Sequence, residues 1–193
     1  MVGYPSAQDG RIIRCVRGGE DGWSPDSRLQ FLSFEIPLNS SAIYIFTRGR
    51  QATGRVTVVP QEANASDKIT VDVASQDHEW DAFRSTTVCQ MERKKGEQGV
   101  GIFVSTGLPD TNYVLTTNEK TPAHLTWSNR RTEVEVTVKI PHQSATPVLQ
   151  LLGFEILTPD FQVTLPNADN FVNFQNLTIH TSNMQVVVGV SPS

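Results

Sequence analysis

Between Thr132 and Val190, apolar and polar residues alternate along the chain, and the alternation restarts after each turn. From Glu133 to Ile140, three valines and an isoleucine occupy every second position, with polar or charged residues between them. A period of two is typical of a β-strand with one buried face, because successive side chains point to opposite faces of a sheet. Pro141 is expected to end this strand, since proline offers no backbone N–H. The alternation recurs over 161–165, 177–179 and 186–190, which predicts sheet stacked on sheet.

Further segments of the same character precede this stretch, separated by residues that favour turns. Strands are expected at Leu29 to Ile36, Ile43 to Thr47, Arg55 to Val59, Lys68 to Val73, Thr86 to Met91 and Gly99 to Val104, with short ones at Tyr113 to Thr116 and Leu125 to Trp127. The third and fourth of these are expected to pair, through a long hairpin or a solenoid corner. The fifth and sixth are expected to form a hairpin with its tip at Glu92 to Gln98. Val148 to Leu157 fits either one bulged strand or two buried strands.

About a dozen short strands therefore fill the chain, and the only segment compatible with a helical turn is Gln76 to Phe83, which is too short to be stable alone. This predicts an all-β fold in preference to α/β or α+β. The spacing of the strands fits a β-solenoid-like or a sandwich-like stack equally well. Residues 1–27, rich in glycine, are expected to form an N-terminal arm, and residues 28–193 a single all-β domain.

Composition limits the partners and the compartment. A net charge of −4 and a pI near 5.5 argue against a nucleic-acid partner. The sequence has no apolar run long enough to span a membrane, and its start lacks the apolar core of a secretion signal. A cytoplasmic location is therefore expected for the chain as written, with the cell surface or secretion as the alternative. Cys15 and Cys89 fit two buried thiols, which we favour, or one disulfide bridge.

No catalytic, metal or cofactor motif is present in the sequence. The four histidines are far apart, and the cysteines form no Cys-x-x-Cys pair. The sequence has no Gly-x-Ser-x-Gly elbow and no glycine-rich phosphate loop. The cluster from Asp77 to Asp81 is expected to be a solvated acidic turn. We therefore predict no catalytic residues, no metal and no cofactor, and we favour a non-enzymatic protein.

The tryptophans provide the best candidates for ligand binding. Two of them have polar neighbours that could bond sugar hydroxyls while the ring stacks on the sugar face: Trp80 with His78 and Asp81, and Trp127 with Asn129, Arg130 and Arg131. The commoner role of a tryptophan is burial in a core with its indole N–H satisfied. These seven residues are the predicted ligand-binding set.

Several segments resemble a known kind of repeat. Val136-Thr-Val-Lys-Ile-Pro, the segment ending in Thr158-Pro-Asp-Phe-Gln-Val-Thr-Leu, and Phe174-Gln-Asn-Leu-Thr-Ile-His-Thr-Ser-Asn resemble the putative-adhesin type of β-repeat. The middle of the chain, with Gly54-Arg-Val-Thr-Val and Ile69-Thr-Val-Asp-Val, is similar to an uncharacterised domain family of filamentous fungi with the same repeats. The resemblance implies stacked short strands of β-solenoid type and no catalytic residues, and the irregular repeat lengths depart from a uniform solenoid.

Together these observations favour a non-catalytic binding or adhesion module that presents loops at strand ends to a glycan or protein partner. This hypothesis rests on fold-level analogy and on the absence of catalytic motifs. One alternative is a self-associating structural protein, or homo-oligomer, that stacks through exposed sheet edges. The other is a polysaccharide-active enzyme with a pair of carboxylates in a groove.

Overall fold

The computed structural model describes residues 5–18, 30–49, 52–62, 68–75, 86–94, 96–104, 132–142, 148–182 and 184–189. In these residues the chain forms twelve strands and one short 3-10 turn, η1 (Ala168–Asn170). The strands assemble into two six-stranded sheets. The prediction of an all-β stack of about a dozen strands is confirmed.

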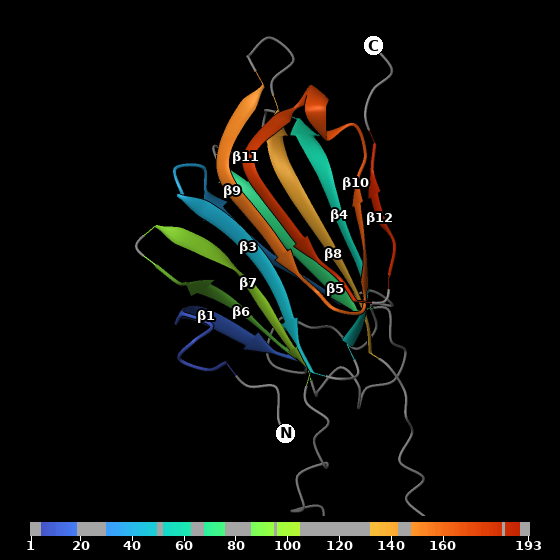
Figure 1. Cartoon of the computed structure of the whole chain (residues 1–193). Coiled ribbons are helices and arrows are strands. Elements are labelled where there is room, and N and C mark those ends of the chain that lie inside the picture. Colours follow the sequence, from blue (N-terminus) through green and yellow to red (C-terminus); the bar gives the residue numbers. More distant parts are fainter. Residues whose placement is uncertain are drawn as a thin grey trace, which may run out of the picture.

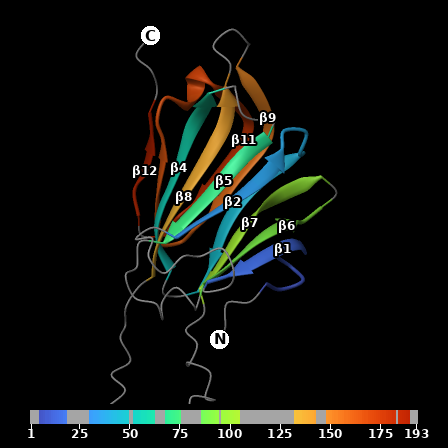
Figure 2. The same ribbon diagram turned by 180° about the vertical axis from the view of Figure 1, so that it is seen from behind.

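The two sheets lie one behind the other (Figures 1 and 2). In order across the sheet, sheet A contains β1 (Arg11–Arg17), β6 (Thr86–Glu92), β7 (Glu97–Val104), β3 (Ala42–Arg48), β9 (Leu149–Leu157) and β11 (Val172–His180). Sheet B contains β12 (Val186–Val188), β10 (Phe161–Leu165), β4 (Ala52–Glu62), β8 (Thr132–His142), β5 (Lys68–Ser75) and β2 (Gln30–Pro37). Their inner faces pack against each other.

The centre of each sheet is parallel. In sheet A the strands β7, β3, β9 and β11 are parallel neighbours, and in sheet B so are β8, β4, β10 and β12. Each of these sheet A strands is followed along the chain by its counterpart in sheet B, which gives four two-strand turns stacked in one direction. Antiparallel strands complete one end of the stack, β6 and β1 in sheet A, and β5 and β2 in sheet B.

This winding shares the facing sheets of a sandwich and the alternating parallel turns expected of a solenoid-like stack. It departs from a uniform solenoid in two ways. The turn formed by β7 and β8 lies before the turn formed by β3 and β4 in the order of the stack, although β7 and β8 come later in the sequence. In addition, four antiparallel strands complete one end. The irregular repeat lengths of the sequence reflect this departure.

The core lies between the sheets, and the alternation of the sequence points into it. In β8, Val134, Val136, Val138 and Ile140 are each at most 1 % exposed. The residues that alternate with them, from Glu133 to Lys139, face outward. They pack with inward residues of both sheets in one continuous cluster. The predicted buried face of this strand is therefore confirmed.

Some predicted pairings are confirmed and others are wrong. The hairpin of β6 and β7 is present, with its turn closed by hydrogen bonds between Arg93, Lys94 and Glu97. β4 and β5 do not form the expected pair, because β8 lies between them and pairs with both. β8, about 80 residues further along the chain, occupies the place beside β4 that was expected for β5. The 149–157 stretch is one strand, and the predicted segments at 76–83, 113–116 and 125–127 lie outside the described residues.

Pro141 does not end its strand, contrary to the prediction from sequence. β8 runs to His142, and Pro141 is paired with Gln61 of β4. On the opposite side, the ladder with β5 stops at Lys139. At Pro141 the strand therefore has a neighbour on one side only, where a missing N–H can be tolerated.

The glycine-rich beginning of the chain contributes to sheet A. Arg11–Arg17 forms the edge strand β1, antiparallel to β6. Its pairing includes Cys15 opposite Cys89, and these residues form a disulfide. The favoured prediction of two free thiols is therefore wrong: the two sulfurs face each other across neighbouring strands, which sequence spacing does not reveal. The boundary predicted at residue 28 stays a prediction.

Candidate functional site

The seven residues predicted to bind a ligand lie outside the described residues. They are His78, Trp80, Asp81, Trp127, Asn129, Arg130 and Arg131. This set therefore stays a prediction.

The described residues instead contain a groove at the end of the stack formed by β11 and β12. These are the last strands of their sheets, and among the described strands none pairs with their outer sides. The backbone N–H and C=O groups on such a side are available to a further strand. Figure 1 shows β12 at the edge of sheet B and β11 at the edge of sheet A.

The groove between these two edges is lined mainly by apolar side chains. It has a volume of about 490 Å³, and its apolar wall includes Leu165, Val172, Phe174, Leu177 and Val188. Gln150, Asp169 and Asn173 add polar groups to its lining. Phe174 is held in place by stacking on the core residue Phe154, with ring centroids 5.4 Å apart. The groove is thus the place where the core of the stack reaches the surface.

Exposed apolar side chains are concentrated near this end. Eight large apolar residues are exposed among the described residues, and five of them lie between Leu177 and Val188. Leu177 is 39 % exposed and Val188 is 52 % exposed, and both line the groove. Single exposed apolar residues are ordinary, whereas apolar residues that line one groove together, as Leu177 and Val188 do, indicate an interaction surface.

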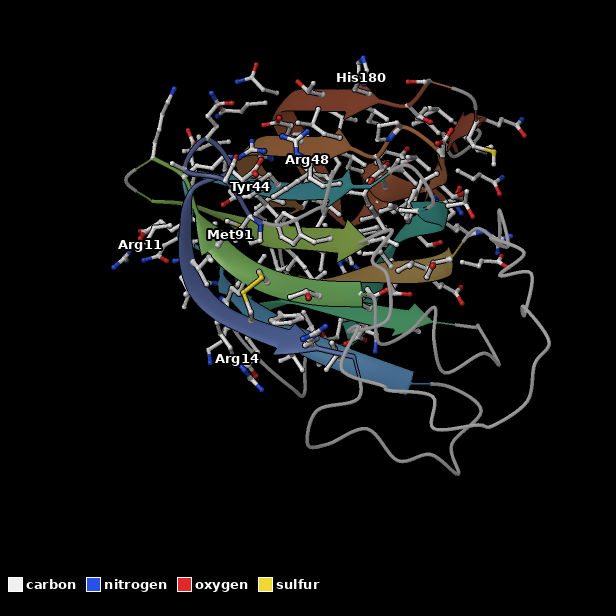
Figure 3. All side chains as sticks on the ribbon, turned by 90° about the horizontal axis from the view of Figure 1, so that it is seen from below. Arg11, Arg14, Tyr44, Arg48, Met91 and His180 are labelled. Carbon is white, nitrogen blue, oxygen red and sulfur yellow. A yellow bond between two sulfur atoms is a disulfide. The ribbon has the colours of Figure 1, made fainter. Side chains whose placement is uncertain are left out.

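The charges of the sheet edges differ between the two ends of the stack. β11 and β12 contain no Asp, Glu, Lys or Arg, and Asp169 is the last charged residue of the sequence. His180 is exposed and points away from sheet A (Figure 3). At the opposite end, β1 carries Arg11, Arg14 and Arg17. Charged edges resist unwanted strand pairing, so the end formed by β11 and β12 lacks this protection.

A second apolar cluster lies on the outer face of sheet A, and it is closed. Tyr44, Phe46, Met91 and Phe103 are each at most 1 % exposed, and Figure 3 shows Tyr44 and Met91 on this face. The guanidinium of Arg93 lies 4.0 Å from the centre of the Tyr44 ring. Burial raises the pKa of Tyr44 to about 12, against an opposing effect of the Arg93 charge. Arg93 also forms an ion pair of 2.8 Å with Glu155. The burial of these side chains indicates that the cluster stabilises the sheet.

Within the described part of the chain, no three His, Cys, Asp or Glu residues come together as a metal site. The same residues include no helix long and apolar enough to cross a membrane. The end groove is therefore the candidate functional site of the described structure. Sequence reasoning missed it, although the charge-free stretch after Asp169 was a signal for it.

Comparison with known proteins shows no family for this chain. No family model and no curated protein matches its sequence. One solved structure with a partial likeness is a putative cell adhesion protein from Clostridium sporogenes, at 11 % identity and a TM-score of 0.36. The likeness covers 83 % of this chain and 58 % of that protein, so the chain spans little more than half its length. Nothing found supports the resemblance to a fungal family.

Proposed function

We propose that this chain is a non-catalytic binding module and that the end groove receives an extended strand of a protein partner. The observation that carries the proposal is the coincidence, at one end of the stack, of an apolar groove and two sheet edges with which no described strand pairs. The name of the Clostridium sporogenes protein is compatible with a binding role, but the proposal rests on the geometry alone.

Strand addition explains why backbone and side-chain features occur together here. An incoming strand that pairs with β11 gains main-chain hydrogen bonds, and its alternate side chains point into the groove. Leu177 and Phe174 would contact those side chains, because both line the groove from β11. The backbone supplies affinity, and the groove selects apolar residues at every second position of the ligand.

Selection from a displayed library of nine-residue peptides tests this function. The full chain is immobilised at low density, and we expect enriched peptides with apolar residues at alternate positions. Leu177→Lys, in the groove, should weaken binding of an enriched peptide at least tenfold. Leu152→Lys is the matched control, because Leu152 is 51 % exposed on β9 and lies outside the groove lining. Peptides that bind both variants equally would count against the proposal.

A glycan ligand held by Trp80 and Trp127 is a separate prediction from the sequence. A glycan array with wild-type chain, Trp80→Ala and Trp127→Ala tests it. We expect a bound glycan to be lost in at least one variant, because stacking on an aromatic ring is the proposed contact. An array without any bound glycan would remove this part of the prediction and leave strand binding unaffected.

We also infer that the protein works in an oxidising compartment, at the cell surface or secreted. The disulfide between Cys15 and Cys89 supports this inference, because disulfides persist outside the reducing cytosol. Mass spectrometry of protein taken from its native source, alkylated before reduction, is the test. Two alkylated cysteines would favour the cytoplasmic location instead.

A further inference from the structure

We propose that the partner at the end groove is a second copy of this chain. In the proposed dimer, β11 of one copy runs antiparallel to β11 of the other about a two-fold axis perpendicular to the sheets. Because this proposal rests on the proposed function, it names the occupant of the same surface. Three properties of that surface favour a second copy over a single extended peptide.

The first property is that, within the described part of the chain, two sheet edges at the same end have no pairing strand. β11 ends sheet A and β12 ends sheet B, and the groove lies between them. A single peptide can pair with one edge only, so the other stays unpaired. A body with two edge strands at the spacing of packed sheets, about 10 Å, can continue both sheets. The same end of a second copy has this spacing, because the two copies have the same structure.

The second property is charge. A two-fold axis places a surface against itself, so any charge near the axis meets a like charge. β11 and β12 contain no Asp, Glu, Lys or Arg, so self-pairing opposes no two such charges across the strand edges. Among the described residues that line the groove, Asp169 is the one that carries a charge. The end formed by β1 could not pair in this way, because antiparallel self-pairing centred on Arg14 would place Arg14 opposite Arg14 and Arg11 opposite Arg17.

The third property is size. The nine residues of β11 span about 30 Å, and two packed sheets with their side chains are about 20 Å thick. The end face therefore covers at most roughly 600 Å², since β12 contributes only three residues to the other sheet edge. Stable interfaces bury about 800 Å² per partner, and weaker ones bury less. We therefore expect a weak dimer whose formation depends on concentration.

Two-fold pairing also buries two apolar residues that the single chain leaves exposed at this end, Leu177 and Val188. Leu177 and Val188 line the groove of each copy, so the two grooves close against each other. Pairing about the axis matches a nine-residue strand with a strand of the same length, whereas pairing β11 with β12 would match nine residues with three. The dimer is closed, since each copy has one such end.

Sedimentation velocity across a concentration series tests the proposal on the full chain with its disulfide intact. We expect wild type to form a two-copy species that increases with concentration. Leu177→Lys should weaken this association at least tenfold, because it places like charges across the two-fold interface. Leu152→Lys should dimerise like wild type. Circular dichroism of both variants confirms that each is folded.

Hydrogen exchange provides a second measurement on wild type. Amides of Val172–His180 should exchange more slowly at concentrations where the dimer dominates than at those where the single chain dominates. A monomer at every concentration would overturn the proposal, as would a dimer that responds equally to both lysine variants, or open-ended assembly. If wild type is a monomer but selected peptides still bind through Leu177, only the second-copy proposal fails. If such peptides are also absent, the proposed function fails with it.

Discussion

At the scale of single residues, Asp9 shows how a charge is stabilised at the surface of sheet A. Its side chain is 3 % exposed, and one oxygen accepts a hydrogen bond of 2.7 Å from Arg48, while the other accepts bonds from the backbone N–H and the hydroxyl of Ser6. Burial alone would raise the pKa of Asp9, but these bonds and the Arg48 charge outweigh it and hold the pKa below its ordinary value. The ionised form is therefore favoured by folding.

We expect Asp9→Asn to lower the free energy of unfolding at neutral pH by about 1.5 to 3 kcal/mol, as for other hydrogen bonds to charged groups. Because the pKa is lowered in the folded state, this stabilisation is present above about 3.8, the ordinary value, and is lost as pH falls through the folded pKa. Urea unfolding of both proteins from pH 7 downward measures it. Glu35→Gln, which breaks the exposed ion pair with Lys68, should have little effect. Equal losses from both variants would contradict the assignment.

Two glycines of β7 allow aromatic rings to cover the outer face of sheet A. Gly101 lies opposite Phe46, and a Cβ added to it would come within 2.6 Å of the Phe46 ring and 2.8 Å of the Phe103 ring. A Cβ on Gly99 would come within 2.0 Å of the Tyr44 carbonyl oxygen. The rings occupy the space that a side chain at either position would need.

Gly101→Ala should therefore destabilise the fold by about 1 to 3 kcal/mol, the usual range for overpacking. Gly99→Ala should cost more, because a backbone atom yields less than a ring. Gly153→Ala is the control: its Cβ would be 3.0 Å from the Ala42 side chain, the mildest of the three contacts. Urea unfolding midpoints should follow this order. A Gly153 variant that loses the most stability would refute it.

At the scale of secondary-structure elements, β8 is the strand on which sheet B depends, because it pairs with β4 on one side and β5 on the other. We expect Val136→Asp to prevent folding and so to abolish the cooperative unfolding transition. Val136 is fully buried, and a carboxylate at this position would have no partner for its charge. Val59→Asp is the control, because Val59 is half-buried and lies opposite Lys139. Thermal unfolding by circular dichroism compares them. A cooperative transition in Val136→Asp would contradict this packing.

The edge strand β1 depends on its disulfide more than on burial. Most of its side chains are exposed, and the bond from Cys15 to Cys89 closes a loop with a sequence separation of 74 residues. Replacing both cysteines with serine should lower the free energy of unfolding by about 2 to 5 kcal/mol. Amide exchange over Arg11–Arg17 should become faster, and in Arg14→Ala it should stay as in wild type. Unchanged exchange after loss of the bond would show that pairing with β6 is sufficient.

At the scale of the whole molecule, the fold depends on contacts between distant parts of the chain. β4 pairs with β8 in a register that joins Ala52 to Thr132, and β3 pairs with β9 through Ile43 and Phe154. Loops of this length must close before the parallel ladders form. We therefore expect refolding of the oxidised chain to take milliseconds to seconds or longer, as in other proteins with non-local pairing. Stopped-flow tryptophan fluorescence measures it, and a microsecond phase with full amplitude would disagree.

The strands could be predicted from the sequence because their cause is local. Val134, Val136 and Val138 alternate with polar residues, and alternation marks a buried face whatever the strand pairs with. The β6–β7 hairpin could be predicted for the same reason, since a short charged turn joins adjacent strands. The partners of β4 could not, because a ladder with a distant strand leaves no local pattern. The prediction for Pro141 was wrong for the same reason, because whether a proline ends a strand depends on how many neighbouring strands flank it at that position.

The candidate site was misplaced because function was sought where the alternation breaks. The tryptophans and arginines of those loops lie outside the described residues, and the groove lies where strands of regular pattern end the stack. Leu177 looks like a core residue in the sequence. Its exposure follows from the absence of a further described strand beyond β11.

The sequence by itself determined that the chain is all-β and which side of each regular strand faces the core, because side-chain alternation is a property of the strand alone. Only the tertiary structure decided which strands are neighbours, that Cys15 meets Cys89, and that β11 and β12 end their sheets together. Each of these three features depends on which strands pair across the sheet. Backbone hydrogen bonds between strands are the same whatever side chains the residues carry. The open end, and the function proposed for it, arise from that order of strands.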